Sequence, residues 1–397
     1  MKILLVAASF PPPAAAGSSQ YLSSIVSHLP PHSVVVQTAD AEPEHAPAFD
    51  RGLPQRVVRH RFIIHVAKAY DVGKLRRLLE YVLWPVAAFW LILREAPQVV
   101  HVGEHNVAGL AALVANRILG VPYLVYTYAE EITYLSTRPI HYFLYLRILR
   151  NAGAVVTVCD YTRDLLVERG VQPQRIHKVL PSVGLEKVIV ASADEIETVR
   201  RRHGLQGNRV LLTVGRLVNR KGHASVVEAL PQILQSFPET RYVIVGQGPE
   251  EETLRHHVSQ AGLQDHVLFL GGVDDRELAC LYQISDVFVM PHRFLPKTRE
   301  TEGCPTVFLE ASANGKPVIG GNAGGVSDAI LDGKTGFIID GSSPQQIADA
   351  VCRLFRDPVL AAEMGRVGVE YVAELTPGRA AEMIVRINES LINNASL

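Results

Sequence analysis

Short apolar runs alternate with amphipathic stretches along most of the chain. In the first half the runs predict buried strands at Lys2–Ala8, Val34–Thr38, Gln98–Val102, Tyr123–Thr127 and Ala154–Cys159. In the second half they predict strands at Arg209–Gly215, Tyr242–Val245, Val267–Leu270, Val287–Met290, Pro317–Ile319 and Gly336–Ile339. Apolar runs separated by helical patterns are typical of parallel sheets with helices on both faces. The pattern therefore predicts an α/β protein.

The periodicity lapses after Lys178–Ser182 and returns with a charged helical stretch, Asp194–His203. A chain of 397 residues is long enough for roughly two or three domains. We expect two Rossmann-like, doubly wound domains that face a central cleft, at residues 1–185 and 186–375. Residues 376–397 are expected to form a C-terminal helix that packs back on the first domain.

Composition narrows the class of protein. Hydrophobic residues make up 48% of the chain and charged residues 20%, with a net charge of −1, so nothing attracts it globally to nucleic acid. The four cysteines (Cys159, Cys280, Cys304 and Cys352) lack metal-ligand spacing and are expected to be thiols, without a metal site.

Neither a signal peptide nor a membrane-spanning helix is predicted. Met1–Ala8 resembles a first strand, and the longest apolar run, Tyr81–Leu93, contains Pro85 and is shorter than the ~20 residues that cross a bilayer. We therefore expect a cytoplasmic protein. The basic and apolar stretch Lys74–Leu79, leading to Trp84 and Trp90, also fits a peripheral membrane contact, although a core helix with a basic edge explains it equally well.

Two carboxylates, Glu302 and Glu310, flank the expected start of a helix. Pro305 suits the first helical position, so the amides of Thr306 and Val307 would lie at its positive end and favour a phosphate. The carboxylates could accept hydrogen bonds from two parts of one elongated ligand. An amphipathic helix with a solvated Glu at each end is the alternative.

Cations and small residues follow two of the expected strands. Gly215, Arg216 and Lys221 come after the first strand of the second domain, where the two cations suit a diphosphate, or form a solvated basic turn. Gly17 and Ser18 follow the first strand of the chain and open a helix whose amides could approach phosphate. Ligands of open α/β sheets bind at such carboxyl ends of strands.

Together these segments resemble family 4 of the retaining GT-B glycosyltransferases. The resemblance runs through most of the chain and is strongest from Val210 to Gly341. It is carried by a G-R-x(4)-K-G segment from Gly215 to Gly222, a G-x-G-P turn from Gly246 to Pro249, and an E-x7-E segment from Glu302 to Glu310.

The resemblance implies roles for these residues. Arg216 and Lys221 would bind the diphosphate, Glu302 the donor sugar and Glu310 the ribose. The Gly17–Ser18 turn would approach the β-phosphate, and Cys304, Thr306 and Val307 would line the donor site beside Gly215. Val273 is expected near the base, with an ordinary loop position as the alternative.

The sequence departs from the family at three places. Ser18 replaces a glycine, Gly303-Cys304-Pro305 replaces Gly-Phe-Gly, and Tyr128 stands where the family has a histidine near the donor sugar. We expect Tyr128 to form a wall of the sugar pocket, with His105 as a substitute polar group or an ordinary loop histidine. Glu131 keeps the acidic position near the acceptor, with Glu130 as the alternative.

The implied activity is metal-independent, cofactor-free transfer of a hexose from a UDP- or GDP-linked donor to a hydroxyl acceptor, such as a lipid or polysaccharide precursor. Arg216, Lys221 and the helix amides would stabilise the departing diphosphate, so no enzymic nucleophile is needed. A catalytically silent nucleotide-sugar-binding subunit and a sugar-nucleotide 2-epimerase are the alternatives.

Overall fold

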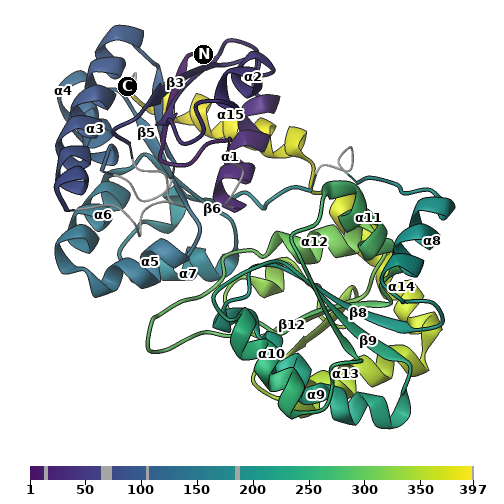
Figure 1. The fold of residues 1–397 in the computed structure, drawn as a ribbon. Helices are drawn as coiled ribbons and strands as arrows, with labels where there is room; N and C mark the ends of the chain where they lie inside the picture. The colour runs from purple at the N-terminus through teal and green to yellow at the C-terminus, as the bar shows by residue number, and fades with distance from the viewer. Residues whose placement is uncertain (13–16, 64–73, 104–106, 184–187, 396–397) are drawn as a thin grey trace. The chain divides into compact units, whose positions relative to one another are not determined.

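The computed structural model describes residues 1–12, 17–63, 74–103, 107–183 and 188–395. The chain forms two compact units (Figure 1). The first unit comprises Met1–Ser182 together with Pro377–Leu397, and the second comprises Val183–Thr376. Each unit is built on its own sheet.

The first unit contains a seven-stranded sheet in the order β3-β2-β1-β4-β5-β6-β7, and all neighbouring strands are parallel. Its strands are β1 (Ile3–Ala7), β2 (Val34–Ala39), β3 (Arg56–His60), β4 (Val99–Gly103), β5 (Tyr123–Thr127), β6 (Ala154–Thr157) and β7 (Ile176–Lys178). Its helices are α1 (Gly17–His28), α2 (Ala46–Arg51), α3 (Lys74–Glu95), α4 (Gly109–Leu119), α5 (Glu130–Tyr134), α6 (Pro139–Asn151), α7 (Asp160–Glu168) and α15 (Pro377–Ala395).

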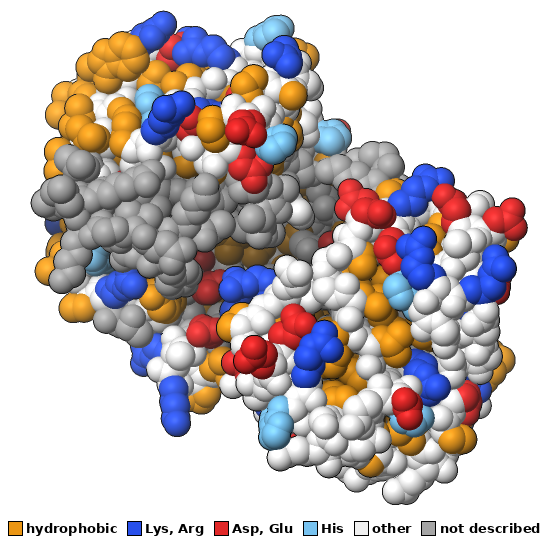
Figure 2. Space-filling view, viewed as in Figure 1, with side chains coloured by type: hydrophobic (Ala, Val, Ile, Leu, Met, Phe, Trp, Pro, Cys, Tyr) orange, Lys and Arg blue, Asp and Glu red, His pale blue; other side chains and the backbone are white. Residues whose placement is uncertain are grey.

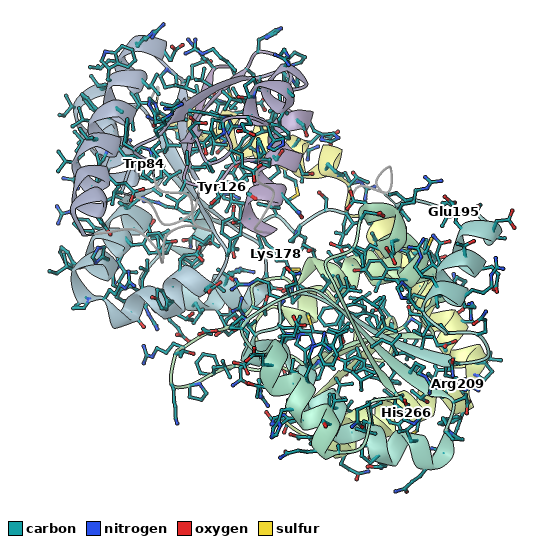
Figure 3. All side chains as sticks on the ribbon, in the orientation of Figure 1. Trp84, Tyr126, Lys178, Glu195, Arg209 and His266 are labelled. Atoms are coloured by element: carbon teal, nitrogen blue, oxygen red, sulfur yellow. The ribbon has the colours of Figure 1, made fainter. Side chains whose placement is uncertain are left out.

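Helices cover both faces of this sheet. Side chains alternate between the faces of a strand, and β4 shows the result. Val100 and Val102 pack in one cluster with α3, α4 and α6, whereas His101 contacts Asn388 of α15 and Gly103 packs closely against Leu22 of α1. Trp84 of α3 is 2% exposed within that cluster (Figure 3), so it cannot contact a membrane as the sequence analysis suggested.

The second unit contains a six-stranded parallel sheet in the order β10-β9-β8-β11-β12-β13. Its strands are β8 (Arg209–Val214), β9 (Thr240–Val245), β10 (Val267–Gly271), β11 (Val287–Met290), β12 (Val318–Gly321) and β13 (Gly336–Ile339). Its helices are α8 (Ala193–Arg202), α9 (His223–Ser236), α10 (Glu251–Gln260), α11 (Asp275–Ile284), α12 (Thr306–Ala313), α13 (Pro344–Arg356) and α14 (Pro358–Ala373). α9, α10 and α13 pack on one face, and α8, α11 and α12 on the other.

The strands expected from the sequence are present, with ends shifted by one or two residues. The sequence analysis missed β3 and β7, which form the two edges of the first sheet. Their segments, Arg56–His60 and Ile176–Lys178, are short and carry several polar side chains. An edge strand is covered less fully than a central one, so it needs no continuous apolar run.

The last helix of the chain belongs to the first unit. α15 lies beside α1 and packs on β4 (Figure 1). A buried polar contact fixes it there, because Asn388 Oδ1 lies 2.9 Å from His101 Nε2, and the Tyr126 hydroxyl lies 3.2 Å from His101 Nδ1 (Figure 3 labels Tyr126). Burial lowers the pKa of His101 to about 4, so the ring is neutral near pH 7.

No helix in the described ranges combines the length and the apolar content needed to cross a bilayer.

We predict that Asn388→Ala lowers the free energy of unfolding by about 1–3 kcal/mol, since it removes the partner of a buried His101 nitrogen. Urea denaturation measures the loss. Asn393→Ala, on an exposed position of the same helix, is the matched control and is expected to change little. Equal effects of the two substitutions would contradict a stabilising role for the buried contact.

Candidate functional site

In the second unit, the loop after β8 is held against the loop after β11. Gly222 ends this first loop in a left-handed conformation with φ 77°, and a Cβ there would collide with the carbonyl oxygen of Pro291. Only glycine combines that backbone with so close an approach. Arg293 Nη2 donates to Asn219 Oδ1 at 2.5 Å, and the Arg293 amide donates to the Arg220 carbonyl at 2.8 Å. The turn Asn219–Lys221 is therefore fixed beside the segment that leads to Glu302.

The Glu302 carboxylate lies between two cations. Lys221 Nζ is 3.2 Å from Glu302 Oε1, and Arg220 Nε donates to the same oxygen at 2.7 Å. Arg220 Nη1 also reaches Glu300 Oε2 at 3.3 Å. The side chains of Lys221, Arg220 and Glu302 are 12%, 13% and 14% exposed. Water therefore screens this cluster only weakly.

The two cations decide the ionisation of Glu302. Burial by itself would raise the pKa of this carboxyl group, but the charges of Lys221 and Arg220 outweigh the burial and hold the pKa at about 2. Glu302 is therefore a fixed anion at neutral pH.

Glu310 has a different environment. Burial raises its pKa, against hydrogen bonds from Tyr282 and Thr306 and the charge of Lys221. The Tyr282 hydroxyl donates to Glu310 Oε2 at 2.8 Å. Lys221 thus acts electrostatically on both carboxylates of the E-x7-E segment. The geometry therefore groups Lys221 with Glu302 and couples it electrostatically to Glu310, and the ligand-binding roles of these residues stay predictions.

The helix that carries Glu310 begins one residue later than expected. Pro305 precedes α12 with ψ 105°, so it caps the helix rather than occupying its first turn, and Thr306 is the first helical residue. Pro305 makes no capping hydrogen bond through its side chain. The amides of Thr306 and Val307 belong to the first turn, whose N–H groups lack intrahelical acceptors. Cys304, just before the helix, is partly exposed and forms no disulfide.

The other predicted residues of the second unit lie around this cluster. Arg216 is exposed, and a Cβ on Gly215 would lie 3.8 Å from Lys221 Cε. Val273 is half-buried after β10 and packs against the core. Their roles toward a donor stay predictions.

In the first unit, Gly17 and Ser18 are the first residues of α1. One turn further on, the ring of Tyr21 meets the ring of Tyr128 edge-on, with centroids 5.9 Å apart. Tyr128 is half-buried. α1 and the loop after β5 are therefore packed together, and both carry residues that the sequence analysis assigned to the site.

Glu131 is 4% exposed and turned onto its own loop. Its Oε1 accepts the Tyr128 amide at 2.6 Å and the Tyr145 hydroxyl at 3.5 Å. Burial raises the pKa of Glu131 to about 7. We infer that it positions Tyr128, whereas the neighbouring Glu130 is exposed. His105 lies outside the described residues.

Sequence reasoning missed Arg220 and Tyr282. Arg220 sits inside the G-R-x(4)-K-G segment at a position that the pattern leaves open, and Tyr282 lies on α11, 28 residues before its partner Glu310. The one available signal was a second cation directly beside Lys221.

Among the described residues, no group of three or more His, Cys, Asp and Glu side chains is arranged to hold a metal ion. The expectation that the reaction needs no metal or cofactor remains a prediction.

Comparison with known proteins identifies the family. Residues 195–370 match the family described as "Glycosyl transferases group 1", and residues 16–181 match "Glycosyl transferase 4-like domain". The chain is 33% identical over 379 residues to the GDP-mannose-dependent alpha-(1-6)-phosphatidylinositol monomannoside mannosyltransferase of Mycobacterium tuberculosis, covering 94% of this chain and 93% of that protein. The chain therefore belongs to family 4 of the GT-B glycosyltransferases, which confirms the resemblance read from its motifs.

Another relative and two solved structures support the same family and fold. A GDP-mannose-dependent monoacylated alpha-(1-6)-phosphatidylinositol monomannoside mannosyltransferase of Corynebacterium glutamicum is 28% identical, with 94% of this chain and 93% of that protein covered. HepE from Anabaena, solved with UDP, has a TM-score of 0.80 at 17% identity, covering 98% of this chain and all of that one. Sucrose-phosphate synthase from Thermosynechococcus elongatus has a TM-score of 0.79 at 21% identity, covering 99% of each chain. The predicted GT-B fold is confirmed, and the protein is a hexosyltransferase that uses a nucleotide-sugar donor.

Glu131→Gln is predicted to change the pH dependence of stability. The folded-state pKa of Glu131, about 7, lies above the ordinary value of 4.5. The contribution of Glu131 to the free energy of unfolding is therefore greatest below about pH 4.5 and falls as the pH rises toward 7. Gln carries no charge to bury, so the variant should lose this slope and melt at a higher temperature than the wild type at pH 8. Melting curves from about pH 5 to 8 test this, with Glu130→Gln as the exposed control.

Proposed function

We propose that this protein transfers mannose from GDP-mannose, with retention of configuration, to a hydroxyl of a phosphatidylinositol mannoside or a closely similar glycolipid. The observation that carries the proposal is the similarity to the Mycobacterium tuberculosis mannosyltransferase, which extends through both units at 33% identity. The Corynebacterium glutamicum relative, whose name specifies the same donor and the same class of acceptor, supports it.

The site supports the chemistry of this transfer. Lys221 and Arg216 bind the diphosphate, and the first amides of α12 add positive potential where negative charge develops as the mannose departs. Glu302 is ionised and accepts a hydrogen bond from a hydroxyl of the donor sugar. Glu310 accepts hydrogen bonds from the ribose hydroxyls. The hydroxyl of Tyr282 donates to Oε2 and thereby orients the carboxylate for the ribose. Diphosphate oxygen takes the acceptor's proton, so no protein base is required.

In this proposal the first unit presents the acceptor and also contributes residues that contact the donor. Gly17 and Ser18 at the start of α1 approach the β-phosphate, and Tyr128, held by Glu131 and Tyr21, forms a wall of the sugar pocket. A tyrosine hydroxyl is a poor base near pH 7, so Tyr128 positions the sugar.

A lipid acceptor would be reached through an apolar face on the first unit. This apolar face consists of exposed side chains of α3, α4 and α6, namely Val82, Leu83, Val86, Trp90, Leu93, Ile118, Leu119, Ile140 and Phe143. Figure 2 shows hydrophobic side chains gathered on the part of the first unit where Figure 1 places α3 and α4.

The positive charge on these helices favours binding to an anionic surface. Exposed Arg94, Arg117 and Arg147 lie on α3, α4 and α6, and neither α4 nor α6 contains Asp or Glu. Apolar side chains edged by arginines are typical of proteins that bind anionic lipid surfaces. We propose that the protein docks peripherally on the cytoplasmic face of a membrane through this apolar face.

The activity is tested with purified protein, GDP-mannose, UDP-glucose as the alternative donor, and a phosphatidylinositol mannoside acceptor, with the product measured by mass spectrometry. We expect mannosylation with GDP-mannose only. Lys221→Ala and Glu310→Ala should each lower kcat/KM roughly 10- to 150-fold, because each loses a charged hydrogen bond worth about 1.5–3 kcal/mol. Near-wild-type activity in both variants would overturn the site assignment. GDP binding without turnover would instead favour a silent binding subunit.

Membrane docking is tested by cosedimentation with vesicles that contain phosphatidylinositol. Val86→Asp combined with Trp90→Glu should weaken binding on the order of tenfold or more, because charge replaces apolar area at the lipid contact. Val359→Asp, 78% exposed on α14 of the second unit, is the control. Unchanged binding of the double variant, or an equal loss in the control, would exclude this surface.

A further inference from the structure

In the proposed reaction Lys221 has two anionic partners, the Glu302 carboxylate and the diphosphate of the donor. In the structure it is 3.2 Å from Glu302 Oε1, and in the proposed function it binds the diphosphate. An ammonium group that turns toward phosphate weakens its hold on the carboxylate. Because Glu302 is only 14% exposed, leaving it without a cation would be costly. A second positive charge must therefore remain at Glu302 when the donor binds.

Arg220 is built to remain there. Its Nε donates to Glu302 Oε1 at 2.7 Å, its Nη1 reaches Glu300 Oε2 at 3.3 Å, and its side chain is 13% exposed. A planar guanidinium held by two carboxylates has little freedom to leave, whereas an ammonium on a flexible stem reorients easily.

The backbone restrains Arg220 as well. Its carbonyl accepts the Arg293 amide at 2.8 Å, and Leu295 pairs with Glu300 across the loop that brings Glu300 and Glu302 back toward the turn. Gly324, with φ 60°, packs against the Glu302 carbonyl so closely that a Cβ would collide with it. Both sides of the Arg220–Glu302 contact are therefore fixed before any ligand arrives.

We propose that Arg220 is a positioning residue that acts as the permanent counter-ion of Glu302 and thereby releases Lys221 to bind the diphosphate. The proposal rests on the proposed function, since it assigns the diphosphate to Lys221. Arg220 itself does not touch the ligand. It keeps Glu302 ionised and oriented toward the donor sugar while Lys221 exchanges one anion for another. The exchange breaks no covalent bond.

A double-mutant cycle between Arg220 and Glu302 tests this mechanism. GDP and UDP are titrated calorimetrically into the wild type, Arg220→Gln, Glu302→Gln and the double variant. Arg220→Gln should weaken nucleotide binding on the order of tenfold, because Lys221 becomes the sole counter-ion of Glu302 and is retained by it. Glu302→Gln should not weaken binding, because it frees Lys221. On the Glu302→Gln background, Arg220→Gln should then have no further effect.

Two other outcomes would refute the role of Arg220. An equal loss in both backgrounds would mean that Arg220 binds the phosphates or acts through its general positive field. No loss from Arg220→Gln with Glu302 intact would mean that Lys221 needs no release. If the wild type binds neither GDP nor UDP, the proposed function fails, which is a distinguishable result.

Arg220→Lys covers the case in which Arg220→Gln does not fold, as judged by circular dichroism. Lysine keeps the charge but cannot span Glu300 and Glu302 at once, so Arg220→Lys should still weaken nucleotide binding relative to the wild type. That loss must disappear on the Glu302→Gln background. A loss that persists there would count against the proposal, because a packing defect does not depend on the charge of residue 302.

Discussion

The candidate site in the second unit depends on one constraint, which is that the carboxylate of Glu302 is kept charged in a place where water reaches it poorly. Burial opposes ionisation, and the adjacent Arg220 and Lys221 reverse the balance, so the pKa falls to about 2. The constraint fixes more than a charge. It ties the loop after β8 to the loop after β11, two segments that neighbouring parallel strands deliver to one edge of the sheet.

The two carboxylates of the E-x7-E segment are held in opposite ways. Glu302 is governed by cations, whereas the pKa of Glu310 is raised by burial, and Glu310 is oriented by the neutral hydroxyl of Tyr282. An anion paired with cations suits a position close to a diphosphate, where the field changes when the donor binds. A carboxylate oriented by a neutral donor suits hydroxyl groups, whose recognition needs direction more than charge.

The first unit uses buried polar groups to place its loops. Glu131 holds the amide of Tyr128, and His101 links Tyr126 to Asn388 on the last helix of the chain. The His101 contacts join segments that the sheet brings together, whereas the Glu131 contact lies within one loop. Each would be costly to leave unsatisfied. The loop that carries Tyr128 thus has its own internal support, and Tyr21 packs against the Tyr128 ring.

The sequence by itself determined the alternation of strands and helices, the family, and the segments that carry the site, because burial on both faces of a parallel sheet imposes continuous apolar runs and glycines mark the turns between them. It did not reveal the edge strands β3 and β7, whose partial exposure relaxes that pattern. Only the tertiary structure decided the partners of the charged groups. Arg220 and Glu302 lie 82 positions apart, and Tyr282 and Glu310 lie on different helices. Strand order and loop packing decide which oxygen contacts which nitrogen. The spacing of residues along the chain encodes neither the strand order nor the loop packing.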